Sequence, residues 1–344
     1  MKPLRILVLM HESLVPPASL EGLSLQEIDE FKAEYDVMAC LEKAGHTVRA
    51  IGLGDNLGEL RAAITDWKPD IAFNLLEEFQ GIVTYDQYVI AFLELMKLPY
   101  TGCNPRGIMI SRDKALSKQI LSYHRIPTPR FALLRKGRRY RAPRRLKFPL
   151  FVKSATDDAS LGISQASIVA DAEHLKERIE FVHEQSGADA LIEEYIEGRE
   201  LYVGVMGNDR LHTFPVWEMD FGTLPDVKAG IATRKVKWDR RYQQKHGIRT
   251  GAAQALPDGC AAYLDRLSKR IYRALSLTGY ARMDFRLRPD GALFVLEANA
   301  NPNISHQEDF ADSAEAGGID YPELLERILR LGLNYRPAWR TEEG

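Results

Sequence analysis

Strand and helix patterns alternate along the first hundred residues of the chain. Short apolar runs there are typical of buried strands, and each is followed by an amphipathic stretch that is typical of a helix. The expected strands span 4–10, 47–53 and 71–76, and the expected helices span 24–44, 57–67 and 84–97. Because strands and helices that alternate with short connections form crossover units, this region is predicted to be a parallel sheet covered by helices.

Length, charge and cysteine content narrow the class of protein. A chain of 344 residues predicts roughly two to three domains, and 46 basic against 48 acidic residues argue against a globally basic nucleic-acid-binding protein. Three distant cysteines, Cys40, Cys103 and Cys260, form no CxxC motif and suit a reducing cytoplasm. The apolar run at 6–10 is too short to span a membrane. We therefore expect a cytoplasmic protein with no membrane or nucleic-acid partner.

Beyond residue 111 the order of elements becomes mixed. The expected strands span 131–134, 150–153, 190–195, 201–206, 281–287 and 292–298, and the expected helices span 113–123, 172–185, 262–275 and 322–331. A polar, poorly periodic segment at 217–257 is expected to be a long loop, which in a compact domain is usually functional or mobile. The basic run at 135–147 is interpreted as a solvated loop in preference to a polyanion contact.

An Asp-Gly pair between two apolar runs is a strong signal for a two-residue hairpin turn. If Asp290 and Gly291 form that turn, Asp284 lies directly opposite Glu297 on the neighbouring strand. Alternation then gives one polar face, with Arg282, Asp284, Arg286, Val295, Glu297 and Asn299, and one apolar face, with Met283, Phe285, Leu287, Phe294, Leu296 and Ala298.

Carboxylates directly opposite each other on a ladder have Cβ atoms about 5 Å apart, and they repel unless something neutralises them. Arg282 or Arg286 could do so as part of an ordinary sheet. A divalent cation is the alternative, because carboxylate and amide oxygens are the ligands that Mg²⁺ prefers. Asn299 on the same face would add a third ligand. The residues alone leave both interpretations open.

Two lysines and a small-residue loop have the chemistry of a phosphate site. Lys114 stands at the start of an expected helix and Lys153 at the end of an expected strand, although a single lysine is usually a surface residue. The loop at 160–164 adds a hydroxyl, a glycine and backbone N–H groups. The strand end at 193–196 could offer backbone groups to a purine, and Glu200 a carboxylate to a ribose. The alternative is an edge strand with solvated acidic residues.

In order, these motifs resemble the ATP-grasp superfamily and, within it, the D-alanine–D-alanine ligase branch. The matching segments are LPYTG at 98–102, DK at 113–114, FVK at 151–153, SLG at 160–162, LIEEYIEGRE at 191–200, RMD at 282–284 and EAN at 297–299. The resemblance spans nearly the whole chain. It implies an α/β fold with α+β subdomains. An N-terminal parallel α/β domain at 1–112 would precede a central ATP-grasp subdomain at 113–200 and a C-terminal one at 201–344, with ATP between the last two.

The resemblance also implies roles for individual residues. The expected ATP contacts are Lys114, Lys153, Ser160, Glu193, Glu194, Tyr195, Ile196, Glu200 and Lys237. The strand end would line the adenine, and Glu200 would hold the ribose. Two Mg²⁺ ions, for which Mn²⁺ could substitute, would be bound by Asp284, Glu297 and Asn299, with Glu297 bridging. The expected catalytic residues are Arg282, Lys237 and Lys153. Arg282 would steady an acyl phosphate, and Lys237, with Trp238, would lie on a mobile loop over the phosphates.

The activity that the resemblance implies is an ATP-dependent carboxylate–amine ligase that forms an amide or peptide bond. Transfer of the γ-phosphoryl group turns a carboxylate into an acyl phosphate, which has a better leaving group than oxide. An amine then attacks, releasing ADP and phosphate, while the closed loop would exclude water. The alternatives are true D-alanine–D-alanine ligation, a phosphotransferase or carboxylating enzyme on the same scaffold, and an ATP-binding module without catalysis.

Departures from the branch fall on the substrate side. Its glycine-rich turn after the first strand is replaced by His11 and Glu12, and its segment after the third strand by 77–84, which begins with Glu77 and Glu78. The substrate-side candidates are His11, Glu12, Glu77, Glu78, Trp238, Asn303 and His306, with ordinary polar turns as the alternative. We expect a small-molecule carboxylate and an amine, such as an amino acid or peptide, other than two D-alanines. The resemblance also suggests a homodimer.

Overall fold

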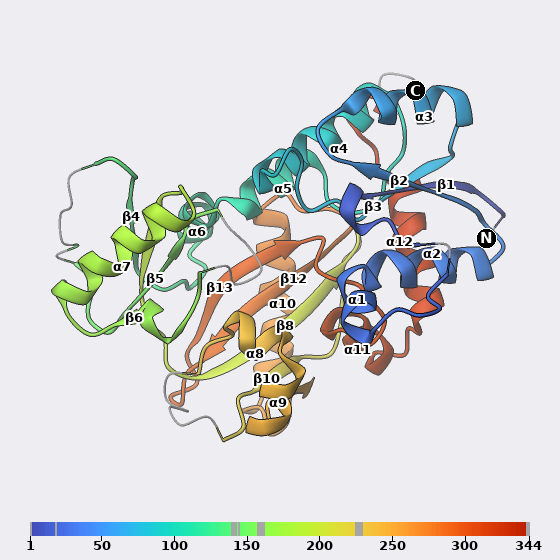
Figure 1. The fold of residues 1–344 in the computed structure, drawn as a ribbon. Coiled ribbons are helices and arrows are strands. Elements are labelled where there is room, and N and C mark those ends of the chain that lie inside the picture. Colours follow the sequence, from blue (N-terminus) through green and yellow to red (C-terminus); the bar gives the residue numbers. More distant parts are fainter. Residues whose placement is uncertain are drawn as a thin grey trace.

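The computed structural model describes residues 2–17, 19–138, 143, 145–156, 162–223 and 230–341. Within this part of the chain the strands form three sheets with helices around them (Figure 1). A parallel sheet stands at one end of the molecule and a small antiparallel sheet at the other, and a larger antiparallel sheet lies between them.

The parallel sheet confirms the topology predicted for the first hundred residues. Its order is β2-β1-β3, from β1 (Arg5–His11), β2 (Thr47–Leu53) and β3 (Ile71–Asn74). Its helices are α1 (Leu25–Glu30), α2 (Lys32–Lys43), α3 (Leu57–Trp67), α4 (Asp86–Leu95) and α5 (Pro105–Arg112), with 3-10 turns η1 (Glu12–Leu14) and η2 (Val83–Tyr85). The single helix predicted over 24–44 is split, because Phe31 has φ −118° and ψ 22°.

The small sheet is antiparallel, with the order β4-β7-β5-β6. Its strands are β4 (Phe131–Leu134), β5 (Leu150–Ser154), β6 (Ile168–Val169) and β7 (Ala190–Glu194), and it is accompanied by α6 (Lys114–Tyr123), η3 (Gln165–Ser167) and α7 (Ala172–Gln185). Leu175, Ile179 and Val182 of α7 share one buried core with Val152 and Ile192 of the sheet.

The large sheet has the order β11-β10-β8-β12-β13, with β9 paired to β8. Its strands are β8 (Arg199–Met206), β9 (His212–Thr213), β10 (Trp217–Asp220), β11 (Arg249–Ala252), β12 (Tyr280–Leu287) and β13 (Leu293–Ala300). The helix α10 (Cys260–Ala274) contributes Leu264, Leu267 and Ile271 to the core under this sheet. The chain ends with α11 (Asp309–Ala316), α12 (Tyr321–Asn334) and α13 (Ala338–Thr341).

The predicted long loop at 217–257 is wrong in part. Besides β10 and β11, the segment contains α8 (Arg234–Trp238) and α9 (Arg240–His246), whose first turns are capped by Thr233 and Asp239. Val236 and Ile248 join a small buried cluster with Trp217. These elements are each too short to show a periodic pattern in the sequence.

The β12–β13 hairpin corrects the predicted turn but confirms the predicted pair. Arg288 N donates to Ala292 O, so the tip is a three-residue loop, and Gly291 lies in it at φ 83°. Next to Asp284 the register shifts by one residue, and Leu296 is the extra residue of this bulge. The longer tip shifts the pairing of the strands by one residue, and the bulge shifts it back by one. Asp284 therefore still lies opposite Glu297.

The bulge also exchanges residues between the two predicted faces. Val295, expected on the polar face, is fully buried in the core beside Phe285. Leu296, expected in the core, lines a cavity instead. Phe294, also expected on the apolar face, lies opposite Arg286. The change of face follows because side chains alternate along a strand, and one extra residue inverts that alternation.

The parallel sheet and the small sheet each lie within one of the ranges expected as domains, whereas β8 of the large sheet begins at Arg199 and crosses the expected boundary at 200. The boundaries at 112 and 200 stay a prediction. The last range also packs on the first, because Leu325 and Ile328 of α12 share a core with Ile6 and Val8 of β1. Figure 1 shows α12 beside the parallel sheet. Among the described residues, no helix combines the length and the apolar character that crossing a membrane requires.

Candidate active site

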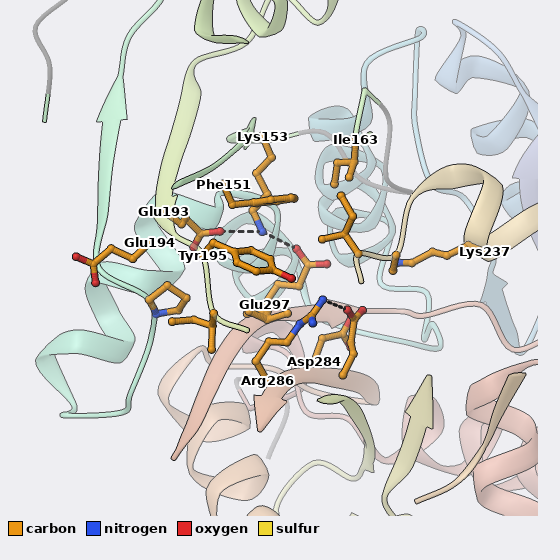
Figure 2. Close-up of a pocket in the computed structure, with 16 residues that line it drawn as sticks. Phe151, Lys153, Ile163, Glu193, Glu194, Tyr195, Lys237, Asp284, Arg286 and Glu297 are labelled. Carbon is orange, nitrogen blue, oxygen red and sulfur yellow. Dashed lines mark hydrogen bonds and ion pairs between the residues drawn. The ribbon is translucent and has the colours of Figure 1, made fainter. Parts of the chain in front are cut away.

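A cavity lies between the small sheet and the β12–β13 hairpin, and its atom-free space, including the opening to solvent, is about 650 Å³ (Figure 2). Its walls come from β5, β7, β12, β13 and the segment at 231–237. The structure thus brings together most of the residues predicted to bind nucleotide and metal, namely Lys153, Glu193, Glu194, Tyr195, Ile196, Glu200, Lys237, Asp284 and Glu297. Phe151, Leu296, Ile231 and Ala232 add apolar surface.

The two opposed carboxylates have different partners. Asp284 is buried, and Arg282 holds it with two hydrogen bonds of 2.8 Å and 3.0 Å. Asn299 Nδ2 donates to Asp284 Oδ2 at 3.0 Å, so the predicted third ligand stands beside the first. Burial raises the pKa of Asp284, while Arg282 opposes the shift. Of the two arginines that could neutralise the carboxylate pair, it is therefore Arg282 that contacts Asp284.

Glu297 belongs to a chain of alternating charges. Lys153 Nζ lies 3.4 Å from Glu297 Oε2 and 3.3 Å from Glu193 Oε2, and Figure 2 shows it between these two carboxylates. Lys118 Nζ lies 2.6 Å from the other oxygen of Glu193. Burial acts to raise the pKa of Glu297, but Lys153, Lys114 and other lysines outweigh it and hold that pKa well below its usual range. The result is a carboxylate that stays ionised.

Lys114 and Lys237 are the other predicted phosphate ligands. Lys114 is buried at the start of α6, directly after the helix-capping Asp113, and its N–H donates to Ala155 O. Lys237 lies in α8 and lines the cavity. Both lower the pKa of Glu297, so both cations act on the carboxylate from separate elements. Ser160 and the side chain of Trp238 lie outside the described residues.

Glu200 is held by a second arginine. Arg286 lies opposite it across the β12–β8 ladder, and their charged groups are 2.6 Å apart. Tyr202 donates its hydroxyl to Glu200 at 2.8 Å. Arg286 also donates to Gly230 O at 2.6 Å, which ties the segment before α8 to this wall. Glu194 contributes to the rim, where its carboxylate accepts from Lys147 N and points away from Lys153 (Figure 2).

Two residues have partners that the sequence analysis missed: Arg286, which lines the cavity, and Lys118, which lies next to it. Lys118 stands one helical turn after Lys114, a spacing that puts both on the same side of α6. The sequence suggests Arg286 only as a partner of the carboxylate pair. Its true partner, Glu200, could be found only by knowing that β8 neighbours β12.

The substrate-side candidates whose side chains the structure describes lie outside the lining of this cavity. His11 Nε2 is 3.6 Å from Glu78 Oε1 at the carboxyl ends of β1 and β3, and Glu12 packs against the turn at Gly54. Asn303 accepts two hydrogen bonds from Ser305, and the His306 ring stacks edge-on against Tyr321. Desolvation raises the pKa of Glu77 although solvent reaches its side chain, and Arg112 opposes the shift.

Comparison with known proteins places this geometry in a family. Residues 120–330 match the family model described as D-ala D-ala ligase C-terminus. The D-alanine–D-alanine ligase of Nitratidesulfovibrio vulgaris (strain Hildenborough) is 33% identical over 298 residues, which cover 85% of this chain and 91% of that protein. The uncharacterized protein y4sG of Sinorhizobium fredii is 31% identical over 300 residues, with 85% of each chain covered.

One solved structure has a similar fold over nearly the whole length of this chain. The D-alanine–D-alanine ligase from Bacillus anthracis complexed with ATP has a TM-score of 0.74 and 26% identity, with 99% of this chain and 100% of that chain covered. The expected ATP-grasp fold is confirmed by this match. With the family model, the relatives and the fold in agreement, the chain belongs to the D-alanine–D-alanine ligase family and is an ATP-dependent carbon–nitrogen ligase.

Proposed function

We propose that this ligase joins a small carboxylate to an amine through an acyl phosphate, with release of ADP and phosphate, and that its substrates are not two D-alanines. The observation that carries the proposal is the cavity wall on which Asp284 and Glu297 face each other while Lys153 and Lys237 stand beside them. A triphosphate and a phosphoryl-transfer step both need cations and metal-binding carboxylates within reach of one another.

The donor set fits magnesium. Asp284, Glu297 and Asn299 offer carboxylate and amide oxygens side by side, the hard ligands that Mg²⁺ prefers. No group of three or more His, Cys, Asp or Glu side chains that could hold a metal occurs among the described residues, so phosphate oxygens would complete the coordination. Bound there, magnesium, or manganese in its place, would neutralise charge on the transferring phosphoryl group. The expectation of two ions, bridged by Glu297, is part of this proposal.

The remaining cavity residues are assigned to the nucleotide. Lys114, Lys153, Lys237 and the loop with Ser160 would hold the phosphates, and the strand end Glu193, Glu194, Tyr195 and Ile196 would line the base. Glu200, which Arg286 keeps oriented, would accept the ribose hydroxyls. The apolar side chains of Phe151 and Leu296 support a flat, uncharged base at this end.

The chain's own residues would then carry the catalytic step. Arg282, fixed by Asp284, would steady the acyl phosphate, and Lys153 would neutralise charge on the phosphates. The segment with Lys237 and Trp238 would cover the site and exclude water that otherwise hydrolyses the intermediate. The tie between Arg286 and Gly230 O supports a covering role, because it anchors the root of that segment at the cavity.

The proposal that two D-alanines are not joined rests on the residues of the substrate side. His11 and Glu78 come together at the carboxyl edge of the parallel sheet, a position where α/β sheets place ligands. Glu77 and Glu78 would bind an ammonium group or a basic amine. His11, Glu12, Trp238, Asn303 and His306 would contribute to the rest of the substrate side. We also propose a cytoplasmic homodimer without membrane or nucleic-acid partners and with domain boundaries near 112 and 200.

The test is a screen for ATP-dependent phosphate release over pairs of amino acids, with product masses recorded. We expect ADP and phosphate only when both a carboxylate and an amine are present. AMP and pyrophosphate as products would contradict the acyl-phosphate route. The named relatives favour D-alanine as a second candidate substrate, so a D-alanyl-D-alanine product at rates above all other pairs would replace our substrate assignment.

A further inference from the structure

Lys118 is a buried cation next to the cavity for which the proposed function has no use. Its residue surface is 1% exposed, and it lies on α6 one turn beyond Lys114. Its ammonium group makes two close contacts, 2.6 Å to Glu193 Oε1 and 2.7 Å to the carbonyl oxygen of Leu296. A buried ammonium group is costly unless it is paired, so this arrangement requires both partners.

Glu193 is shared between two lysines that it holds unequally. Lys118 approaches one carboxylate oxygen at 2.6 Å, whereas Lys153 approaches the other at 3.3 Å. Lys153 is in turn shared with Glu297 at 3.4 Å. Two cations and two carboxylates therefore alternate, and Lys153 is the member with the longer contacts on both sides. It is the member that can leave most easily.

The consequence appears when Lys153 moves to a phosphate. Glu193 is 3% exposed, and without a second cation the departure of Lys153 would leave a buried carboxylate uncompensated. Lys118 removes that penalty, because it stays with Glu193 whatever Lys153 does. We propose that Lys118 is a positioning residue of this ligase, which neutralises Glu193 and thereby frees Lys153 for the nucleotide phosphates. The inference rests on the proposed function, since it requires a nucleotide in the cavity.

The second contact of Lys118 links the same cation to the metal side. Leu296 is the extra residue of the β13 bulge and immediately precedes Glu297. The hydrogen bond from Lys118 satisfies the carbonyl oxygen at this irregular position, and bulged residues lack their usual ladder partner. One buried lysine thus fixes both the strand that presents Glu297 and the carboxylate that holds Lys153.

Calorimetry with magnesium and ADP tests this role without relying on turnover. The proteins compared are wild type, Lys118→Met, Glu193→Gln and the double variant, with adenosine as a matched ligand that carries no phosphate. We expect Lys118→Met to weaken ADP binding by about 10- to 100-fold, as for other residues that orient a binding group. Adenosine binding should change by less than about threefold, and the double variant should return to within about threefold of Glu193→Gln.

The double variant decides between charge balance and simple packing. If Lys118 acts by neutralising Glu193, removing both charges restores ADP binding. A double variant as weak as Lys118→Met, or equal losses for ADP and adenosine, would overturn the proposal. If Lys118→Met fails to fold, the double variant must fold and bind ADP, and its failure to fold would also overturn the charge-balancing role.

Controls separate this inference from the proposed function. Lys176→Met removes an exposed lysine that pairs with Glu180 at 3.7 Å on α7, and it should leave ADP binding unchanged. Wild-type protein that binds neither ADP nor adenosine would overturn the proposed function itself. Wild-type binding of ADP with an unchanged Lys118→Met variant would overturn the role of Lys118 alone.

Discussion

The charged side chains of the cavity are buried and paired, whereas those at the carboxyl edge of the parallel sheet are more exposed. In the cavity, Lys153 and Glu193 have side chains 8% and 4% exposed and are joined in an alternating set of ion pairs. At the sheet edge, His11 and Glu78 are 26% and 38% exposed and lie 3.6 Å apart. Glu34, also in the N-terminal region, is buried and has no ion pair among the described residues.

The difference separates a preformed site from an adaptable one. Buried charges that pair with one another are in place before a ligand binds, which suits a nucleotide whose phosphates are the same in every reaction. Solvated charges at strand ends can be exchanged at little cost to the fold, which suits substrates that differ between enzymes. The following changes test that division, and we order them by the size of the expected effect.

Replacing Glu297 by Gln should have the largest effect. The substitution keeps the shape of the side chain but removes the charge that pairs with Lys153 and one of the two predicted metal carboxylates. We expect turnover to fall by about 10²- to 10³-fold, measured as ADP and phosphate formed with a productive substrate pair. Glu323→Gln on the exposed surface of α12 is the control. Normal turnover of Glu297→Gln would show that the reaction does not take place at this cavity.

Glu34→Gln should change the pH dependence of stability. Burial raises the pKa of Glu34 from 4.5 to about 7. Over that interval the folded protein holds a proton that the unfolded chain has lost, so the free energy of unfolding falls as pH rises. The total loss is on the order of 3 kcal/mol and is complete above pH 7. The variant stays neutral and should lack this decline.

Urea unfolding at about pH 5 and about pH 8 measures the effect of Glu34. Wild type should lose stability between these values, and Glu34→Gln should then be the more stable protein at the higher pH. Glu42→Gln, an exposed residue of the same helix α2, should behave as wild type does. Identical pH slopes for all three proteins would show that burial does not raise the pKa of Glu34.

Glu200→Gln should weaken ATP binding without changing the chemical step. The amide can still accept from Tyr202, but it loses the charge paired with Arg286 and the stronger acceptor for a ribose. We expect KM for ATP to rise by about tenfold with little change in kcat, because the interaction is made equally before and during reaction. A fall in kcat with an unchanged KM would place Glu200 in the chemistry instead.

Glu77→Gln should have the smallest effect and should act on the other substrate. We expect KM for the amine to rise by about threefold to tenfold while KM for ATP is unchanged, since a partly solvated charge pair is weaker than a buried one. Because the pKa of Glu77 is raised, amine binding in the wild type should strengthen as pH rises and this carboxyl ionises. Glu59→Gln in α3, which is exposed, serves as control, and a matching rise in KM for ATP would argue for a common site.

The sequence predicted which residues meet in the cavity, and the reason is physical. Strand alternation and ordered motifs are local properties, so they place Asp284, Glu297 and Asn299 together without knowledge of the whole fold. The ion pairs of Lys118 and Arg286 depend on which sheets and strands become neighbours. That information appears only after folding: Lys118 and Leu296 are separated by 178 positions in the chain.

The hairpin shows the limit of counting residues. The expected two-residue turn is wrong, yet Asp284 and Glu297 are paired as predicted, because the bulge at Leu296 reverses the offset of the tip. The same counting put Val295 and Leu296 on the wrong faces. At the sheet edge, where turns and not ladders position the side chains, the roles of His11, Glu12, Glu77, Glu78, Asn303 and His306 stay predictions.

The cancelling offsets in the β12–β13 hairpin also matter for engineering this ligase. The bulge stands between the tip and the site, and β12 is paired with β8 along its whole length. The bulge thus separates the exposed tip at 289–291 from the paired carboxylates. A longer loop that carries a fluorophore or an affinity tag could replace these residues while Asp284 and Glu297 keep their register, which would give a reporter on the strands that form the site.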